Sequence, residues 1–201
     1  MTEAPRPHDN TYWVVPGRVL AGEYPGDRDP DVARERLEAY LETGITHFID
    51  LTEDVDGLLP YDGLLAEIAA ERGLMVEYRR HPIRDMSVPR SPQEVVSILE
   101  AIEGALRAGG RAYVHCWGGI GRTGTVVGCY LVRRGMTGEE ALEALAALWP
   151  QMEKSRWYRQ TPQTLEQVQF VRAWRHGAGA EDDSGRAVED TAEETGSDGS
   201  R

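Results

Sequence analysis

Residues 114–125 read VHCWGGIGRTGT. The segment that leads into them, RAYVHC at 111–116, is short and apolar and predicts a buried strand. Residues 122–135, which follow, carry apolar side chains at helical spacing. Three glycines between strand and helix allow the backbone to curl so that successive N–H groups point inward. A turn of this kind at the start of a helix predicts an anion-binding site.

Two side chains in this stretch supply the chemistry. The positive end of the helix favours the thiolate form of Cys116, which is a strong nucleophile. Arg122 has the planar guanidinium that binds two oxygens of a phosphate at once. A nucleophile, an amide cradle and an arginine therefore converge on one tetrahedral oxyanion. The groups that we expect to bind it are the backbone of Trp117, Gly118, Gly119, Ile120 and Gly121 together with Arg122.

The remaining folded part alternates predicted strands with predicted helices. We expect further strands at 45–52 and 74–83, and helices at 32–44, 61–73, 91–110, 137–149 and 161–176. The predicted helix caps are Asp31, Ser91 (in a capping box with Glu94) and Thr161. Alternation of this kind predicts an α/β fold with a central, mainly parallel, twisted sheet flanked by helices.

The charge of the chain is uneven. The 201 residues carry a formal net charge of −12. Eight acids against two bases lie in residues 177–201, so half of the net charge belongs to this segment. With one large aliphatic residue it lacks the apolar surface to fold, and we predict a disordered acidic tail, with an interaction tail as the alternative. The predicted domains are a flexible N-terminus at 1–10, a catalytic domain at 11–176 and this tail.

Composition also excludes several classes of protein. The sequence has no apolar run long enough to span a membrane and no signal peptide, so we expect no membrane association. Its acidity argues against a scaffold that binds nucleic acid. The two cysteines, Cys116 and Cys129, indicate a reducing, cytoplasmic compartment, and Cys129 is expected in the core. The histidines show no metal-ligand spacing, so neither a metal nor another cofactor is expected.

The motif HCxxGxGRTG at 115–124 resembles the signature of the cysteine-dependent protein tyrosine phosphatases. The closest likeness is to the small atypical dual-specificity phosphatases, because similar segments recur elsewhere in the chain: NTYWVVPGRVLAG at 10–22, FIDLTED at 48–54 and RTGTVVGCYLV at 122–132. The resemblance implies a phosphatase fold and a mechanism without metal, in which Cys116 forms a phosphocysteine intermediate that water then hydrolyses.

The resemblance also assigns roles outside the cradle. The proline-bounded loop HPIRDMSVP at 81–89 places Asp85 where the family has its general acid and base. Spacing alone does not choose Asp85 over Asp50, Asp54 or Asp56. His115 would support the loop, and Thr123 would hydrogen-bond the thiolate.

The stretch TPQTLEQVQF at 161–170 resembles a family element that positions the attacking water, which would give this role to Gln163 and Gln167. A plain helix N-terminus explains the two glutamines equally well.

The expected activity is hydrolysis of phosphomonoesters, foremost phosphotyrosine with or without phosphoserine and phosphothreonine. The partner would be a phosphorylated protein. A phosphoinositide, an inositol phosphate or an RNA 5′ end is the alternative substrate, although the interior of the loop lacks the lysines that lipid-directed members tend to carry. A phosphate-binding protein without activity is a further alternative, disfavoured because Cys116, Arg122 and Asp85 are all present. A sulfurtransferase is disfavoured by the motif.

Overall fold

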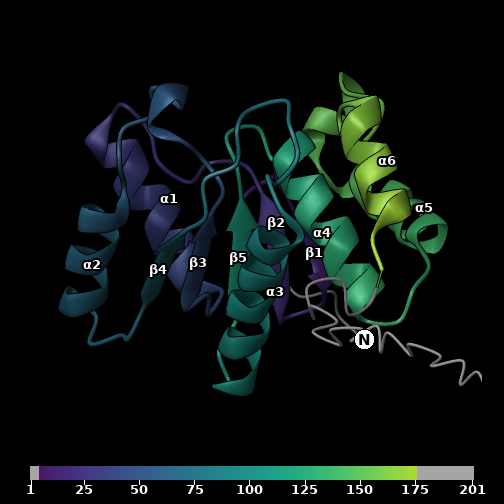
Figure 1. Ribbon diagram of the computed structural model, residues 1–201. Helices are drawn as coiled ribbons and strands as arrows, with labels where there is room; N and C mark the ends of the chain where they lie inside the picture. The colour runs from purple at the N-terminus through teal and green to yellow at the C-terminus, as the bar shows by residue number, and fades with distance from the viewer. Residues whose placement is uncertain (1–4, 176–201) are drawn as a thin grey trace, which may run out of the picture.

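A five-stranded sheet lies at the centre of the structure, a computed structural model that describes residues 5–175 (Figure 1). The strands are β1 (Thr11–Val15), β2 (Val19–Gly22), β3 (His47–Asp50), β4 (Glu77–Arg80) and β5 (Ala112–His115). They are ordered β1-β2-β5-β3-β4. Only β1 runs antiparallel to its neighbour, and the other pairs are parallel. The predicted mainly parallel sheet is confirmed.

Within residues 5–175, six α-helices cover the two faces of this sheet. They are α1 (Pro30–Glu42), α2 (Asp62–Glu71), α3 (Pro92–Arg107), α4 (Gly121–Arg133), α5 (Gly138–Leu148) and α6 (Leu165–Ala173). Short 3-10 turns are η1 (Asp54–Asp56), η2 (Trp149–Gln151) and η3 (Glu153–Arg156). Helices α1 and α2 pack on one face, while the other four lie on the opposite face and toward the β1 edge (Figure 1).

The strands divide their side chains between two hydrophobic cores. Along β5, Val114 faces the core under α3 and α4, whereas Tyr113 faces the core under α1 and α2. The same alternation holds in β1 and β3, because successive side chains of a strand point to opposite faces. Both faces are therefore apolar, as a parallel sheet covered by helices on both sides requires. Cys129 lies in the first core as expected, and burial raises the pKa of its thiol.

Two predicted helix starts were wrong. Helix α1 begins at Pro30, and its cap is Asp29 rather than Asp31. The Asp29 side chain accepts the backbone N–H of Asp31, and proline suits the first helical position because its missing N–H would have no partner there. Helix α6 begins at Leu165 with Thr164 as its cap, so the predicted start at Thr161 was four residues too early.

The capping box predicted for Ser91 and Glu94 forms only in part. Ser91 Oγ accepts the backbone N–H of Glu94 at 3.2 Å. The Glu94 carboxylate, however, accepts the backbone N–H of Arg90 at 2.7 Å instead of returning to Ser91. Ser91 therefore caps α3 as predicted, but the Glu94 carboxylate binds the N–H of the residue before Ser91 and not that of Ser91 itself.

The predicted domains include a flexible segment at 1–10 and a disordered tail at 177–201. Residues 5–10 belong to the segment predicted to be flexible, and here Arg6 Nη1 donates hydrogen bonds to the carbonyls of Thr11 and Gln151 at 2.7 and 2.6 Å. The predicted tail at 177–201 lies outside the described residues. Within residues 5–175, no helix is both long and apolar enough to cross a lipid bilayer.

Candidate active site

Three loops meet at the carboxyl ends of the parallel strands. Residues 116–122, called the phosphate loop below, follow β5, while the loop at 51–61 follows β3 and the loop at 81–91 follows β4. Backbone hydrogen bonds join the roots of these loops: Leu51 N–H donates to His115 at 2.9 Å, and Ile83 N–H donates to Leu51 at 3.1 Å. Side chains far apart in sequence are thereby brought together where α/β sheets commonly bind ligands.

A cavity of about 330 Å³ opens at this point. Cys116 is 3% exposed and contributes to its lining. The other lining residues come from the loop after β4, the phosphate loop and the segment between α5 and α6: Asp85, Met86, Trp117, Gly118, Ile120, Gly121, Lys154, Tyr158 and Gln163.

Glycine is required in the phosphate loop for two physical reasons. Gly119 has a φ of +74°, and a Cβ built there would lie 2.5 Å from the carbonyl carbon of Gly22 at the end of β2. A Cβ on Gly121 would lie 2.9 Å from both polar atoms of the Gln167 carboxamide. The loop therefore packs directly against β2 and against the segment that opens α6.

Arg122 is 1% exposed and is fixed from behind. Its Nη1 donates to Asp56 Oδ2 at 2.6 Å and to the carbonyl of Ile83 at 3.0 Å. Nη2 lies 3.1 Å from Asp85 Oδ1 in an ion pair. Both Nε and Nη2 are buried and have no hydrogen-bond partner among the described residues. One edge of the guanidinium is thus anchored, and the other keeps its donors available.

The charge of Arg122 is secured by its surroundings. Burial alone would lower the pKa of Arg122, but Cys116, Asp56 and Asp85 together raise it above its ordinary value. A cation in this position is stabilised by the same acidic groups that define the site.

His115 is fully buried under the nucleophile, between two fixed partners. Its Nε2 lies 2.7 Å from the hydroxyl of Tyr61, and its Nδ1 lies 3.3 Å from the carbonyl oxygen of Cys116. A carbonyl only accepts, so Nδ1 carries the proton and Nε2 accepts from Tyr61. Burial lowers the pKa of His115, although Asp50 opposes this shift. The ring is a neutral support beneath the phosphate loop.

The other predicted site residues lie around Cys116 and Arg122. Thr123 is buried in the first turn of α4, and its Oγ1 has no hydrogen-bond partner among the described residues. Asp85 lies on the loop after β4 with its side chain 49% exposed, next to Met86, whose φ is +59°.

The two glutamines occupy different positions. Gln163 lines the cavity. Gln167 is buried, and its Nε2 donates to the carbonyl of Ser87 at 2.9 Å. Its Oε1 accepts the backbone N–H groups of Gln163 and Thr164, both at 3.1 Å. Gln167 thus joins the start of α6 to the loop that carries Asp85.

Sequence reasoning did not assign roles to two residues of this site. Asp56 appeared only as an alternative acid, yet its side chain is 4% exposed and anchors Arg122. Lys154 borders the cavity, and its Nζ donates to the carbonyl of Gly118 at 3.3 Å. One sequence signal did mark Lys154, because it is the only lysine in the chain.

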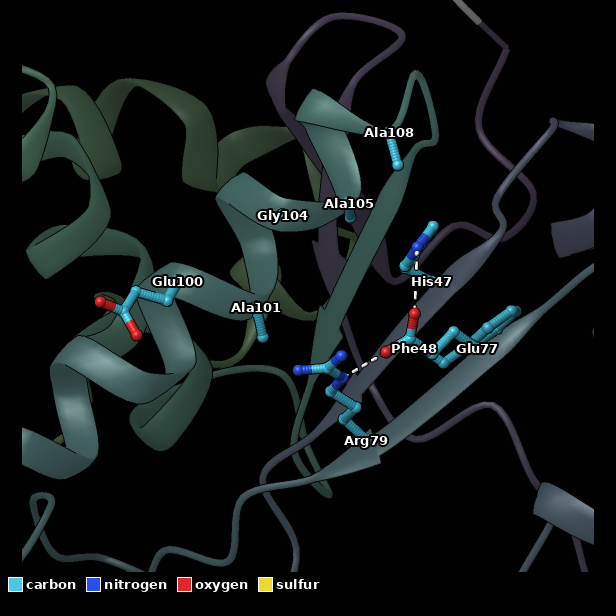
Figure 2. A pocket seen from close by; sticks show the side chains of 9 residues that line it. All are labelled: His47, Phe48, Glu77, Arg79, Glu100, Ala101, Gly104, Ala105 and Ala108. Carbon is cyan, nitrogen blue, oxygen red and sulfur yellow. Dashed lines mark hydrogen bonds and ion pairs between the residues drawn. The ribbon is translucent and has the colours of Figure 1, made fainter.

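A second cavity, of about 200 Å³, lies between α3 and strands β3 and β4 (Figure 2). Glu77 pairs there with both His47 and Arg79, so its charge is already matched. Small side chains of α3, including Ala101 and Ala105, form the opposite wall. No predicted site residue lines this cavity. Across residues 5–175, no group of three or more His, Cys, Asp or Glu is arranged to hold a metal ion.

Known proteins that are similar to this chain include two phosphatases. A 25% identical relative is the putative tyrosine phosphatase 067L of invertebrate iridescent virus 3, matched over 79% of this chain and 62% of its own length. The mouse dual specificity protein phosphatase CDC14B is 41% identical over 69% of this chain and 27% of its own length. The chain thus spans less than two thirds of either relative.

Solved structures share the same fold. The active form of Tk-PTP is 29% identical, with a TM-score of 0.58 over 81% of this chain and 94% of that chain. The model of the PTP-SAK family, described as "Swiss Army Knife protein, DSP-PTPase phosphatase domain", matches residues 8–188. The resemblance read from HCxxGxGRTG is confirmed, and the chain belongs to this family of dual-specificity-type phosphatase domains.

Proposed function

We propose that this protein hydrolyses phosphomonoesters of proteins through a phosphocysteine intermediate on Cys116. One observation carries the proposal. Cys116 lies at a cavity where Arg122 keeps Nε and Nη2 without hydrogen-bond partners among the described residues, although its Nη1 is firmly anchored. Buried polar groups are normally paired, so two donors without hydrogen-bond partners, one of them ion-paired with Asp85, fit a ligand with two acceptor oxygens. A phosphoryl group has this geometry.

The first step transfers the phosphoryl group to the protein. The Cys116 thiolate attacks phosphorus, and the bond between phosphorus and the leaving oxygen breaks. Asp85 gives its proton to that oxygen. Arg122 and the amides of the phosphate loop stabilise the negative charge on the three remaining oxygens. Binding of phosphate to Arg122 competes with the ion pair between Nη2 and Asp85, which frees Asp85 for the leaving group.

The second step regenerates the thiolate. Water attacks phosphorus, its proton passes to the Asp85 carboxylate, and the bond between phosphorus and sulfur breaks. Thr123 Oγ1, which has no hydrogen-bond partner among the described residues, would donate to the departing thiolate. Gln163 on the cavity wall would align the water, while Gln167, whose carboxamide already binds Ser87 and Thr164, would hold this segment in place. Inorganic phosphate leaves, and no metal is required.

The walls of the cavity favour a phosphotyrosine side chain. Trp117, Met86 and Tyr158 line the same opening, and each is about half exposed. Aromatic rings pack well against aromatic and thioether side chains. Phosphoserine and phosphothreonine would gain less from these walls, so we expect their hydrolysis to be slower.

The decisive experiment is hydrolysis of an aryl phosphate by the wild-type protein and by Cys116→Ser. The wild type should be active in the presence of a chelator and inhibited by vanadate, and Cys116→Ser should be inactive. Cys129→Ser is the matched control, because that thiol is buried in the core away from the cavity. Activity that survives Cys116→Ser would contradict the mechanism.

The substrate is tested with a panel of phosphotyrosyl and phosphoseryl peptides, phosphoinositides and inositol phosphates, with Cys116→Ser as the blank. Fastest hydrolysis of phosphotyrosyl peptides supports the proposal. Preference for a lipid or an inositol phosphate would replace the proposed substrate and leave the mechanism intact.

The role of Asp85 has its own test. Asp85→Ala should slow the hydrolysis of esters with poor leaving groups far more than that of esters with good ones, because only poor leaving groups need a proton. Equal slowing across a series of aryl phosphates would remove Asp85 from the role of general acid.

A further inference from the structure

The carbonyl groups of the phosphate loop are held from outside the cradle. Four of them accept a hydrogen bond: Cys116 from His115 Nδ1 (3.3 Å), Trp117 from Tyr24 N–H (2.9 Å), Gly118 from Lys154 Nζ (3.3 Å) and Ile120 from Thr161 Oγ1 (2.7 Å). In a planar trans peptide the N–H points away from the carbonyl. Each donor therefore fixes the orientation of one peptide, and the N–H of the next residue points away from that donor.

Lys154 differs from the other three donors. Tyr24 donates through its backbone, and His115 and Thr161 donate from neutral side chains, whereas the ammonium of Lys154 is charged. The peptide that it holds leads into Gly119, which adopts a left-handed φ of +74° and has no side chain of its own to restrain it. A charged donor makes a stronger hydrogen bond than a neutral one. Lys154 thus restrains the peptide that joins Gly118 to Gly119.

The ammonium of Lys154 is itself held in place. Glu23 Oε2 lies 2.5 Å from Nζ, and the side chains of Lys154 and Glu23 are only 25% and 14% exposed. The backbone N–H of Lys154 donates to Asn10 Oδ1 at 3.1 Å, and Asn10 Nδ2 donates to Glu23 Oε1 at 3.4 Å. The charge of Lys154 is matched by a neighbouring carboxylate, which fits a fixed support better than a free cation awaiting an anionic substrate.

We propose that Lys154 is a positioning residue: held by Glu23, it orients the N–H of Gly119 toward the phosphoryl group through the carbonyl of Gly118. The inference rests on the proposed phosphate-binding function of the loop. It assigns a role in phosphate binding to η3, a segment 36 residues beyond Gly118 in sequence.

The test compares Lys154→Met with Lys154→Arg. Methionine keeps an unbranched stem, one atom shorter than lysine, and removes the donor, whereas arginine restores a charged donor. Arg156→Met is the matched control, since Arg156 lies on the same turn with its side chain 73% exposed. For each protein we would measure vanadate binding by calorimetry and kcat and KM for 4-nitrophenyl phosphate, after verifying the fold by circular dichroism.

Lys154→Met should weaken vanadate binding about tenfold and lower kcat/KM by a similar factor, because the Gly119 amide contacts the phosphoryl group in both complexes. Lys154→Arg should recover most of the loss, and Arg156→Met should match the wild type. The ratio of rates between good and poor leaving groups should not change, since Asp85 is untouched. Vanadate affinity equal to that of the wild type in a folded Lys154→Met protein would overturn the inference.

Glu23→Gln separates positioning from direct contact with substrate. If Lys154 positions the loop, releasing its ammonium should weaken vanadate binding. If Lys154 instead binds substrate as a cation, removing the carboxylate should strengthen the binding of anionic peptides, and that result would overturn the inference. The proposed function fails separately, and the inference with it, if the wild-type protein does not bind vanadate at all.

Discussion

At the scale of single residues, Arg122 depends on an acid that does no chemistry itself. Asp56 holds Nη1 at 2.6 Å, while Nε and Nη2 remain available for ligand. Without that anchor the guanidinium would keep its charge and lose its direction. Small displacements of a substrate-binding group have large effects on rate.

Asp56→Asn should therefore lower kcat/KM for an aryl phosphate by about tenfold to a hundredfold. Asp54→Asn is a close control, because Asp54 lies two residues away with its side chain 93% exposed and pairs with Arg80 instead. Steady-state kinetics of the two variants side by side check the prediction. Similar activities of the two would show that the anchor is dispensable.

The buried His115 predicts a dependence of stability on pH. Burial places its folded pKa below the ordinary value of 6.5, so the unfolded chain binds the proton more readily as the pH falls through that value. The free energy of unfolding should therefore decrease through His115 between about pH 7.5 and about pH 5.5, on the two sides of that value. His81, whose pKa burial and Arg79 also lower, adds a contribution of the same sign.

Urea unfolding of the wild type and of His115→Asn at the two pH values measures this contribution. The variant should lose less stability than the wild type on acidification, and the remaining slope would include that of His81. A wild type and a variant with the same pH dependence would show that His115 does not carry the effect.

At the scale of elements, helices α4 and α6 approach so closely that only glycine fits at their contact. A Cβ on Gly128 would lie 2.7 Å from both methyl groups of Val171. Gly63 in α2 has nothing within 4 Å of the corresponding position. The two glycines are chemically identical and differ only in what surrounds them.

Alanine should therefore change the free energy of unfolding in opposite directions at these two sites. Gly128→Ala should destabilise the protein by about 1–3 kcal/mol through overpacking. Gly63→Ala should stabilise it by about 0.5–1 kcal/mol, because alanine restricts the unfolded chain and favours helix. Thermal or urea unfolding measures both, and a neutral Gly128→Ala would mean that α6 shifts without cost.

Sequence patterns predicted the elements better than their ends. Apolar patterns located β3, β4, β5 and the helices because each buries a defined face, whereas β1 and β2 were not predicted as strands. The starts of α1 and α6 were misplaced because several neighbouring residues there can serve as caps. The caps actually used make local contacts: Asp29 accepts the N–H of Asp31, and Thr164 forms a capping box with Gln167. Thr161 is used elsewhere, as the donor to the carbonyl of Ile120.

The site was predictable only where it is local. Cys116 and Arg122 lie on one loop, and their spacing carries the chemistry. Asp56 reaches Arg122 across 66 residues, and Lys154 reaches Gly118 across 36, so only the folded topology brings these pairs together. Family resemblance, and not spacing, pointed to Asp85, whose 3.1 Å approach to Arg122 the fold provides.

At the scale of the whole molecule, the net charge of the chain is negative and repels a phosphorylated ligand, although a cationic side chain lies at the cavity. The chain carries −12, and half of this belongs to residues 177–201, whereas the cationic Lys154 borders the cavity and Arg122 lies buried behind it, paired with Asp85 of its lining. Long-range repulsion is screened by salt, while contacts inside a buried site are screened far less.

A chain that ends at residue 176 should therefore hydrolyse an acidic phosphopeptide faster than the full chain at an ionic strength of about 20 mM, and at the same rate above about 200 mM. Initial rates over a salt series test this, with a neutral peptide as the control. A difference that persists at high salt would indicate that the acidic segment acts by direct contact.

The outward hydrogen bonds of the phosphate loop also bear on biosynthesis. The nucleophile leaves the ribosome well before Lys154, Thr161 and Gln167, which hold the loop or the segment that carries Asp85. A nascent chain that ends before these residues contains Cys116 without the supports that shape its cradle. Because domains fold as units when their long-range contacts become available, phosphatase activity should emerge only after residues up to Gln167 have left the ribosome. A truncated translation product would thus carry the signature motif and lack the enzyme's activity.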